Sequence, residues 1–135
     1  MKKLKIIVVE NDANERQFIY EGFNESGLFE VIACVAKAGE LFTELRTKGN
    51  IPDLILSDLN MPGKGGIDIL AEMQSEPDFS HIPVVIMSTS GEEINRKRCI
   101  ALGAFDYIVK PDTFLEYAEF ASDLYERVFR HVAHT

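Results

Sequence analysis

The chain lacks an excess of positive charge and any long hydrophobic run. Its 14 Lys and Arg residues face 22 Asp and Glu residues, and the formal net charge is −8. A surface of this sign repels a phosphate backbone, which argues against direct nucleic-acid binding. Only four apolar residues, 6–9, separate the basic N-terminus from Glu10, too few for a signal peptide or a membrane span. We therefore expect a cytoplasmic protein with no nucleic-acid or membrane partner.

Cysteine and histidine are also scarce, with two and three copies respectively. Cys34 and Cys99 lie far apart in apolar surroundings, without the paired spacing of a metal site. We expect both thiols to be small buried hydrophobic groups. The three histidines are scattered between a loop and the C-terminal tail, so the sequence does not support His-based catalysis.

Five short apolar runs alternate with longer helical patterns along the chain. The runs are nearly continuous in apolarity, which is typical of strands buried on both faces of a parallel sheet. They cover residues 4–9, 29–35, 53–57, 83–88 and 105–109. At 135 residues the chain has the length of one domain with one shared core. The pattern predicts a single α/β domain over 1–135.

Helix boundaries are marked by capping residues. Asp12 with Glu15, and Ser90 with Glu93, have capping-box spacing, which predicts Asp12 and Ser90 as N-caps of the helices that follow. The last helix is predicted over about 112–131, because apolar residues recur there at helical spacing.

Polar residues follow four of the five predicted strands. In a parallel β-α sheet the C-terminal ends of the strands meet along one edge, where ligands bind. That edge would hold Glu10, Asp58, Ser88 and Lys110. Asp58 stands where a buried strand ends and a Gly/Pro loop begins, which makes it a candidate nucleophile.

Three motifs, in this order, resemble the receiver domains of bacterial two-component response regulators in their single-domain, chemotaxis-like form. They are Asp58-x-x-Met61-Pro62-x-x-x-Gly66, Ser88 at the end of the strand Pro83–Met87, and Tyr107-Ile108-Val109-Lys110-Pro111. The resemblance covers essentially the whole chain. It implies a flavodoxin-like three-layer sandwich with a five-stranded parallel sheet in 2-1-3-4-5 order, five helices and no output domain.

The resemblance also implies a role for each motif residue. Asp58 would accept phosphoryl from a histidine kinase or phosphotransfer protein. Ser88 would hydrogen-bond one phosphoryl oxygen and Lys110 would pair with another, since cations must offset the charge of the transition state. The Lys110-Pro111 bond would be cis. Tyr107 would change rotamer as Ser88 moves toward the phosphoryl group, and the chain would act as a switch rather than an enzyme.

One departure from the family pattern affects the implied Mg²⁺ site. The family usually places two acidic residues after the first strand, and this chain has Glu10 and Asn11 there. An asparagine offers an oxygen but no charge, so metal binding in the resting state should be weak. The implied ligands are Glu10, Asn11, Asp58 and the backbone carbonyl of Asn60. Asp12 is a possible further ligand, although its spacing favours the capping role.

Two functional hypotheses follow from these residues. The first is a phosphorylation-controlled switch, a monomer or weak homodimer, that regulates a separate protein through the face formed by the fourth helix, fifth strand and fifth helix. The basic cluster 96–98 lies on that fourth helix, and an ordinary solvated face is its alternative interpretation. The second is a phosphorylation-independent interaction module, a pseudo-receiver whose metal site has decayed at Asn11.

Overall fold

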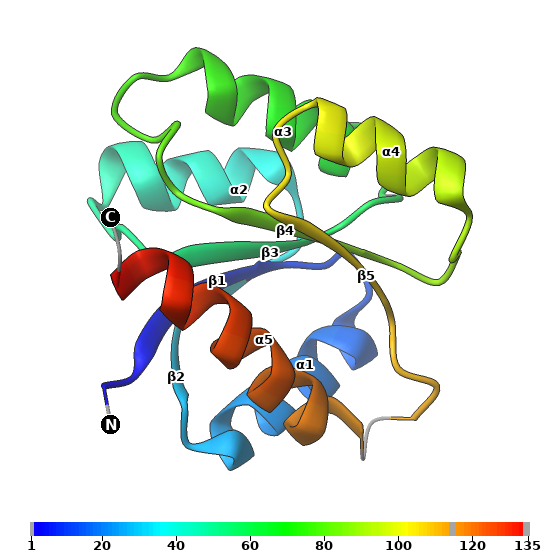
Figure 1. Cartoon of the computed structure of the whole chain (residues 1–135). Helices are drawn as coiled ribbons and strands as arrows, with labels where there is room; N and C mark the ends of the chain where they lie inside the picture. Colours follow the sequence, from blue (N-terminus) through cyan, green and yellow to red (C-terminus); the bar gives the residue numbers. More distant parts are fainter. Residues whose placement is uncertain (1, 114–115, 134–135) are drawn as a thin grey trace.

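A five-stranded parallel sheet forms the centre of the protein in the computed structural model, which describes residues 2–113 and 116–133 (Figure 1). Neighbouring strands pair in the order β2-β1-β3-β4-β5. The strands are β1 (Leu4–Val9), β2 (Phe29–Val35), β3 (Leu54–Asp58), β4 (Val84–Ser88) and β5 (Asp106–Val109). The predicted 2-1-3-4-5 order is confirmed, and each predicted strand boundary lies within one residue of the observed one.

Helices cover both faces of the sheet, so the predicted three-layer, flavodoxin-like sandwich is confirmed. In Figure 1, α1 and α5 lie on one face, and α2, α3 and α4 lie on the other. The helices of the described residues are α1 (Ala13–Ser26), α2 (Ala38–Phe42), α3 (Gly66–Ser75), α4 (Glu93–Ala101) and α5 (Tyr117–Ala133), with a π-helical turn η1 (Thr43–Thr47) continuing α2.

The sheet divides the core into two apolar clusters. Successive side chains of a strand point to opposite faces, so Ile6 and Val8 of β1 pack with α1 and α5, while Ile7 and Val9 face α2, α3 and α4. All four are fully buried. This two-sided burial explains why the strands read as continuous apolar runs.

The two predicted N-caps have different outcomes. Asp12 is the N-cap of α1, where its Oδ1 accepts a hydrogen bond of 2.9 Å from the Glu15 N–H. The prediction for Ser90 is wrong, because α4 begins at Glu93 with Glu92 in the cap position. The Ser90 Oγ instead accepts from the Glu92 N–H at 3.3 Å, so the hydroxyl closes a turn ahead of the helix.

The prediction that both thiols are buried is wrong for Cys34, which lies on the edge strand β2. Cys99 is buried as expected, but Cys34 is only half-buried, since β2 has a neighbour on one side alone. The pKa of the Cys34 thiol is nevertheless raised to about 11. Partial burial is the main cause of this rise, the charge of Arg16 opposes it, and the charge of Glu10 adds to it.

The last helix begins later than predicted. It starts at Tyr117 rather than near Asp112, and residues 114 and 115 lie outside the described part of the chain. Tyr117 is 2% exposed and belongs to the core, whereas Phe129 is 37% exposed.

Within residues 2–113 and 116–133, none of the helices is both long and apolar enough to cross a membrane.

Candidate functional site

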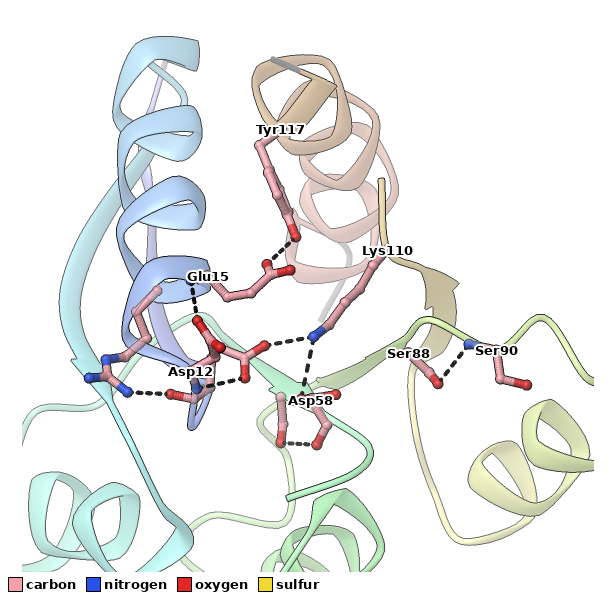
Figure 2. A network of polar contacts seen from close by, with 10 residues as sticks. Asp12, Glu15, Asp58, Ser88, Ser90, Lys110 and Tyr117 are labelled. Carbon is pink, nitrogen blue, oxygen red and sulfur yellow. Dashed lines mark hydrogen bonds and ion pairs between the residues drawn. The ribbon is translucent and has the colours of Figure 1, made fainter. Parts of the chain in front are cut away.

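Three charged side chains meet at the C-terminal edge of the sheet (Figure 2). Glu10 follows β1, Asp58 ends the adjacent β3, and Lys110 follows β5. Because β4 separates β3 from β5, the long lysine side chain has to reach across it. The Lys110 Nζ donates to Glu10 Oε1 at 2.7 Å and lies 3.4 Å from Asp58 Oδ2. One ammonium group is thus shared by two carboxylates.

All three charges are largely removed from solvent, and the pKa values of Asp58 and Lys110 are shifted. Glu10 is 1% and Asp58 7% exposed. Burial, followed by the negative charge of Glu10, raises the pKa of Asp58 from its ordinary 3.8 to about 6, with Lys110 opposing that rise. Burial acts to lower the pKa of Lys110, but its hydrogen bond to Glu10 and the charge of Asp58 leave that pKa above its ordinary value.

The loop after Asp58 folds back tightly because two glycines allow it. A Cβ on Gly66 would lie 3.0 Å from the Asp58 carbonyl oxygen, and one on Gly65 would lie 2.6 Å from the Leu59 carbonyl oxygen. The Gly66 N–H donates to that Leu59 oxygen at 2.9 Å. Gly66 of the sequence motif is therefore needed where the loop crosses the backbone of Asp58. Asn60 lies exposed in the same loop.

The two predicted switch residues are linked to each other through Ser90. Ser88 is 1% exposed, and its Oγ accepts from the Ser90 N–H at 3.1 Å. Tyr107 is also 1% exposed, and its hydroxyl donates to the Ser90 carbonyl at 2.5 Å. The Ser88 oxygen thus accepts a hydrogen bond from the turn after β4, and Ser88 lies one residue past the Met87 that pairs with Asp58.

The predicted metal ligands fit Mg²⁺ in donor type. Asn11, Asp12 and Asn60 are exposed at the edge beside Glu10 and Asp58, and Mg²⁺ prefers such hard oxygen donors. Each Glu10 oxygen already has a partner, because Oε2 accepts from the Asp12 N–H at 3.2 Å and Oε1 accepts from Lys110 at 2.7 Å. No three Asp, Glu, His or Cys side chains of residues 2–113 and 116–133 converge as a metal-holding group.

One expectation for the lysine is wrong. The Lys110-Pro111 peptide bond is trans, and the ammonium group contacts both Glu10 and Asp58 from this geometry. The implied cis bond is thus absent from the described site.

Sequence reasoning missed two hydrogen bonds near the acidic edge of the sheet. The Arg16 Nη1 donates to the Glu10 carbonyl at 2.7 Å. The Tyr117 hydroxyl donates to Glu15 Oε2 at 2.8 Å, which connects α5 to the first turn of α1. The only signal for this pair was the capping spacing of Glu15, which gives no indication of a partner about a hundred residues away.

The chain is similar in sequence to one protein family and to individual relatives. A family model for the response regulator receiver domain matches residues 6–118. The phosphate regulon transcriptional regulatory protein PhoB of Rhizobium meliloti is 33% identical over 107 residues, which are 79% of this chain and 45% of that protein. A protein-glutamate methylesterase/protein-glutamine glutaminase of Clostridium acetobutylicum is 30% identical over 130 residues, 95% of this chain and 36% of that protein. The chain thus spans less than half the length of either relative.

Solved structures give matches over nearly full length. The phosphorylated cyanobacterial phytochrome response regulator RcpA is 33% identical, with 93% of each chain covered and a TM-score of 0.79. A response regulator receiver domain from Rhodospirillum rubrum is 27% identical, with 96% of this chain and 94% of that chain covered and a TM-score of 0.77.

Proposed function

The chain belongs to the response regulator receiver domain family, and from this premise we propose that it is a phosphorylation-controlled switch with Asp58 as phospho-acceptor. The observation that supports Asp58 is its position at the end of β3, within 3.4 Å of the Lys110 ammonium group. A carboxylate nucleophile and a cation that can pair with a phosphoryl oxygen stand side by side there.

The transfer we propose starts from a phosphohistidine of a kinase or phosphotransfer protein. An Asp58 oxygen forms the new bond to phosphorus as the N–P bond breaks, and the electron pair of that bond stays on the imidazole nitrogen. Charge spreads over the three equatorial oxygens in the transition state. The Lys110 ammonium offsets it, and the Ser88 hydroxyl moves toward the phosphoryl group and donates a hydrogen bond to it. Asp58 must be ionised to attack, and its pKa of about 6 leaves it mostly ionised at neutral pH.

We propose that Mg²⁺ is held by Asp58, the side-chain oxygen of Asn11 and the backbone carbonyl of Asn60, with Glu10 close by and Asp12 as a possible further ligand. When bound, the ion would supply positive charge to the phosphoryl oxygens in addition to that of Lys110. Two carboxylates share one ammonium at this edge, so the net charge available to attract the ion is small. Weak binding in the resting state follows from that balance.

The output we propose acts through α4, β5 and α5. Ser88 and Tyr107 are joined through Ser90, so a movement of the Ser88 hydroxyl changes the contacts of Tyr107. The Arg96 guanidinium lies 5.4 Å from the centre of the Tyr107 ring and 3.8 Å from Asp106. One residue of the basic cluster is therefore coupled to the switch residue, which supports a protein partner on this face.

The test is the intact mass of the protein after incubation with acetyl phosphate, with and without Mg²⁺. The wild type is expected to gain one phosphoryl group in a metal-dependent reaction, mapped to Asp58. Asp58→Asn is expected to gain none, and Asp78→Asn, which changes an exposed carboxylate, is the matched control. A wild type that takes no phosphoryl group on Asp58 would refute the switch and favour the interaction module decayed at Asn11.

A further inference from the structure

A series of residues joined pairwise by hydrogen bonds runs from α5 to the acidic edge of the sheet (Figure 2). The Tyr117 hydroxyl donates to Glu15 Oε2 at 2.8 Å, and the Glu15 N–H donates to Asp12 Oδ1 at 2.9 Å. The Asp12 N–H donates to Glu10 Oε2 at 3.2 Å, and Glu10 Oε1 accepts from Lys110 at 2.7 Å. The start of α5 is thereby connected to the cation that serves Asp58.

Packing fixes the position of the tyrosine in this series. Tyr117 is 2% exposed. A Cβ on Gly22 of α1 would lie 2.4 Å from the Tyr117 Cβ and 3.0 Å from its carbonyl carbon. The two helices therefore touch at Gly22, and the Phe120 ring packs edge-on against the Tyr117 ring at 5.7 Å. The Tyr117 side chain is fixed by this packing, so its hydroxyl can restrain the Glu15 carboxylate to which it donates.

The Glu15 carboxylate points toward the same space at the C-terminal edge of the sheet as Lys110. Figure 2 shows the Glu15 side chain coming from α1 and the Lys110 side chain from the segment after β5. The Glu15 charge is one of those that raise the pKa of Lys110, which places it within electrostatic range. Glu15 is only half-buried, and its side chain is long enough to adopt other rotamers. A free Glu15 carboxylate would be drawn toward the nearby ammonium group.

We propose that Tyr117 is a positioning residue that holds the Glu15 carboxylate away from Lys110, so that the ammonium remains shared by Glu10 and Asp58. Its consequence for phosphorylation rests on the proposed function. In Tyr117→Phe the released carboxylate binds Lys110, and less positive charge is available to a phosphoryl group at Asp58. Removing the Glu15 charge in the same protein restores the original arrangement.

The first measurement is independent of phosphorylation. In protein labelled with ¹⁵N at the lysine ammonium groups, the Lys110 resonance is assigned by its loss in Lys110→Arg. Tyr117→Phe is expected to shift this resonance, and Tyr117→Phe with Glu15→Gln is expected to return it to the wild-type position. Tyr125→Phe is the matched control, since Tyr125 is a buried tyrosine of α5 whose hydroxyl donates to the distant Lys2 carbonyl.

The second measurement is the initial rate of phosphorylation by acetyl phosphate. Tyr117→Phe is expected to be about threefold to tenfold slower, the range for one charge-assisted contact, and the double variant is expected to recover. An unmoved Lys110 resonance, a shift that Glu15→Gln does not reverse, or an unchanged rate in a phosphorylated wild type would overturn the proposal. A wild type without a phosphoryl adduct refutes the proposed function instead, and the resonance still decides the position of Glu15.

Discussion

Replacing Asp58 by Asn should make the metal-free protein more stable near neutral pH. Asp58 is nearly buried beside Glu10, and Lys110 only partly offsets the repulsion between the two carboxylates. The pKa of Asp58 is consequently raised from 3.8 to about 6. A carboxylate with a raised pKa disfavours the folded state once it is ionised, and an asparagine of the same shape carries no such charge.

The size and sign of the effect follow from that pKa. The folded protein holds the Asp58 proton more tightly than the unfolded chain does. The resulting stabilisation is complete below the unfolded pKa of 3.8 and is lost as the pH rises through about 6. At 1.36 kcal/mol per pH unit the loss is about 3 kcal/mol, and residual solvation reduces this to about 1–3 kcal/mol. For a chain of this length that is a melting-temperature difference of roughly 4–12 °C.

Urea unfolding in EDTA, at about pH 4 and about pH 8, measures this difference. Asp58→Asn should exceed the wild type in free energy of unfolding at the higher pH and approach it at the lower pH. Asp78→Asn, on the exposed segment after α3, should match the wild type at both. An Asp58→Asn variant that is no more stable than the wild type near pH 8, or equally more stable at both pH values, would refute the reasoning.

Three further outcomes are expected. Asn11→Asp should tighten Mg²⁺ binding by roughly tenfold, because it adds a carboxylate beside the ion; isothermal titration against Asn14→Asp as control would contradict this if both variants bound alike. Iodoacetamide should alkylate Cys34 far more slowly in the native protein than in urea at about pH 8.5, because the thiol pKa is raised to about 11; equal rates would contradict the raised pKa. Gly22→Ala should lower the free energy of unfolding by about 1–3 kcal/mol, since its Cβ would overlap Tyr117, and an unchanged urea midpoint would show that α1 and α5 separate easily.

The sheet was predictable from sequence because its burial leaves a simple pattern. Strands covered on both faces read as continuous apolar runs, and their boundaries agree with the structure within one residue. The convergence of Glu10, Asp58 and Lys110 was also predictable, because parallel strands end at one edge. Local spacing also identified Asp12 as a cap, since the partner is only three residues away.

Contacts between distant helices were not predictable in the same way. The Tyr117–Glu15 hydrogen bond depends on how closely α1 approaches α5, and that distance is set by the missing side chain of Gly22. The error at Ser90 has a different, local cause, because its hydroxyl accepts a hydrogen bond in the turn ahead of α4 and does not cap the helix itself. The partial exposure of Cys34 depends on β2 being an edge strand, which spacing around the cysteine does not reveal.

The shared ammonium group would connect the proposed phosphorylation of Asp58 to the proposed binding of Mg²⁺. If Lys110 moves to a phosphoryl oxygen on Asp58, Glu10 keeps only its hydrogen bond from the Asp12 N–H. A carboxylate that is 1% exposed and has lost its cation is destabilised by several kcal/mol. A divalent cation at the edge would relieve this charge, so the phosphorylated protein should bind Mg²⁺ more tightly than the resting protein. Because such coupling is reciprocal, Mg²⁺ should favour the phosphorylated state, whatever the affinity of the resting site that we propose to be weakened by Asn11.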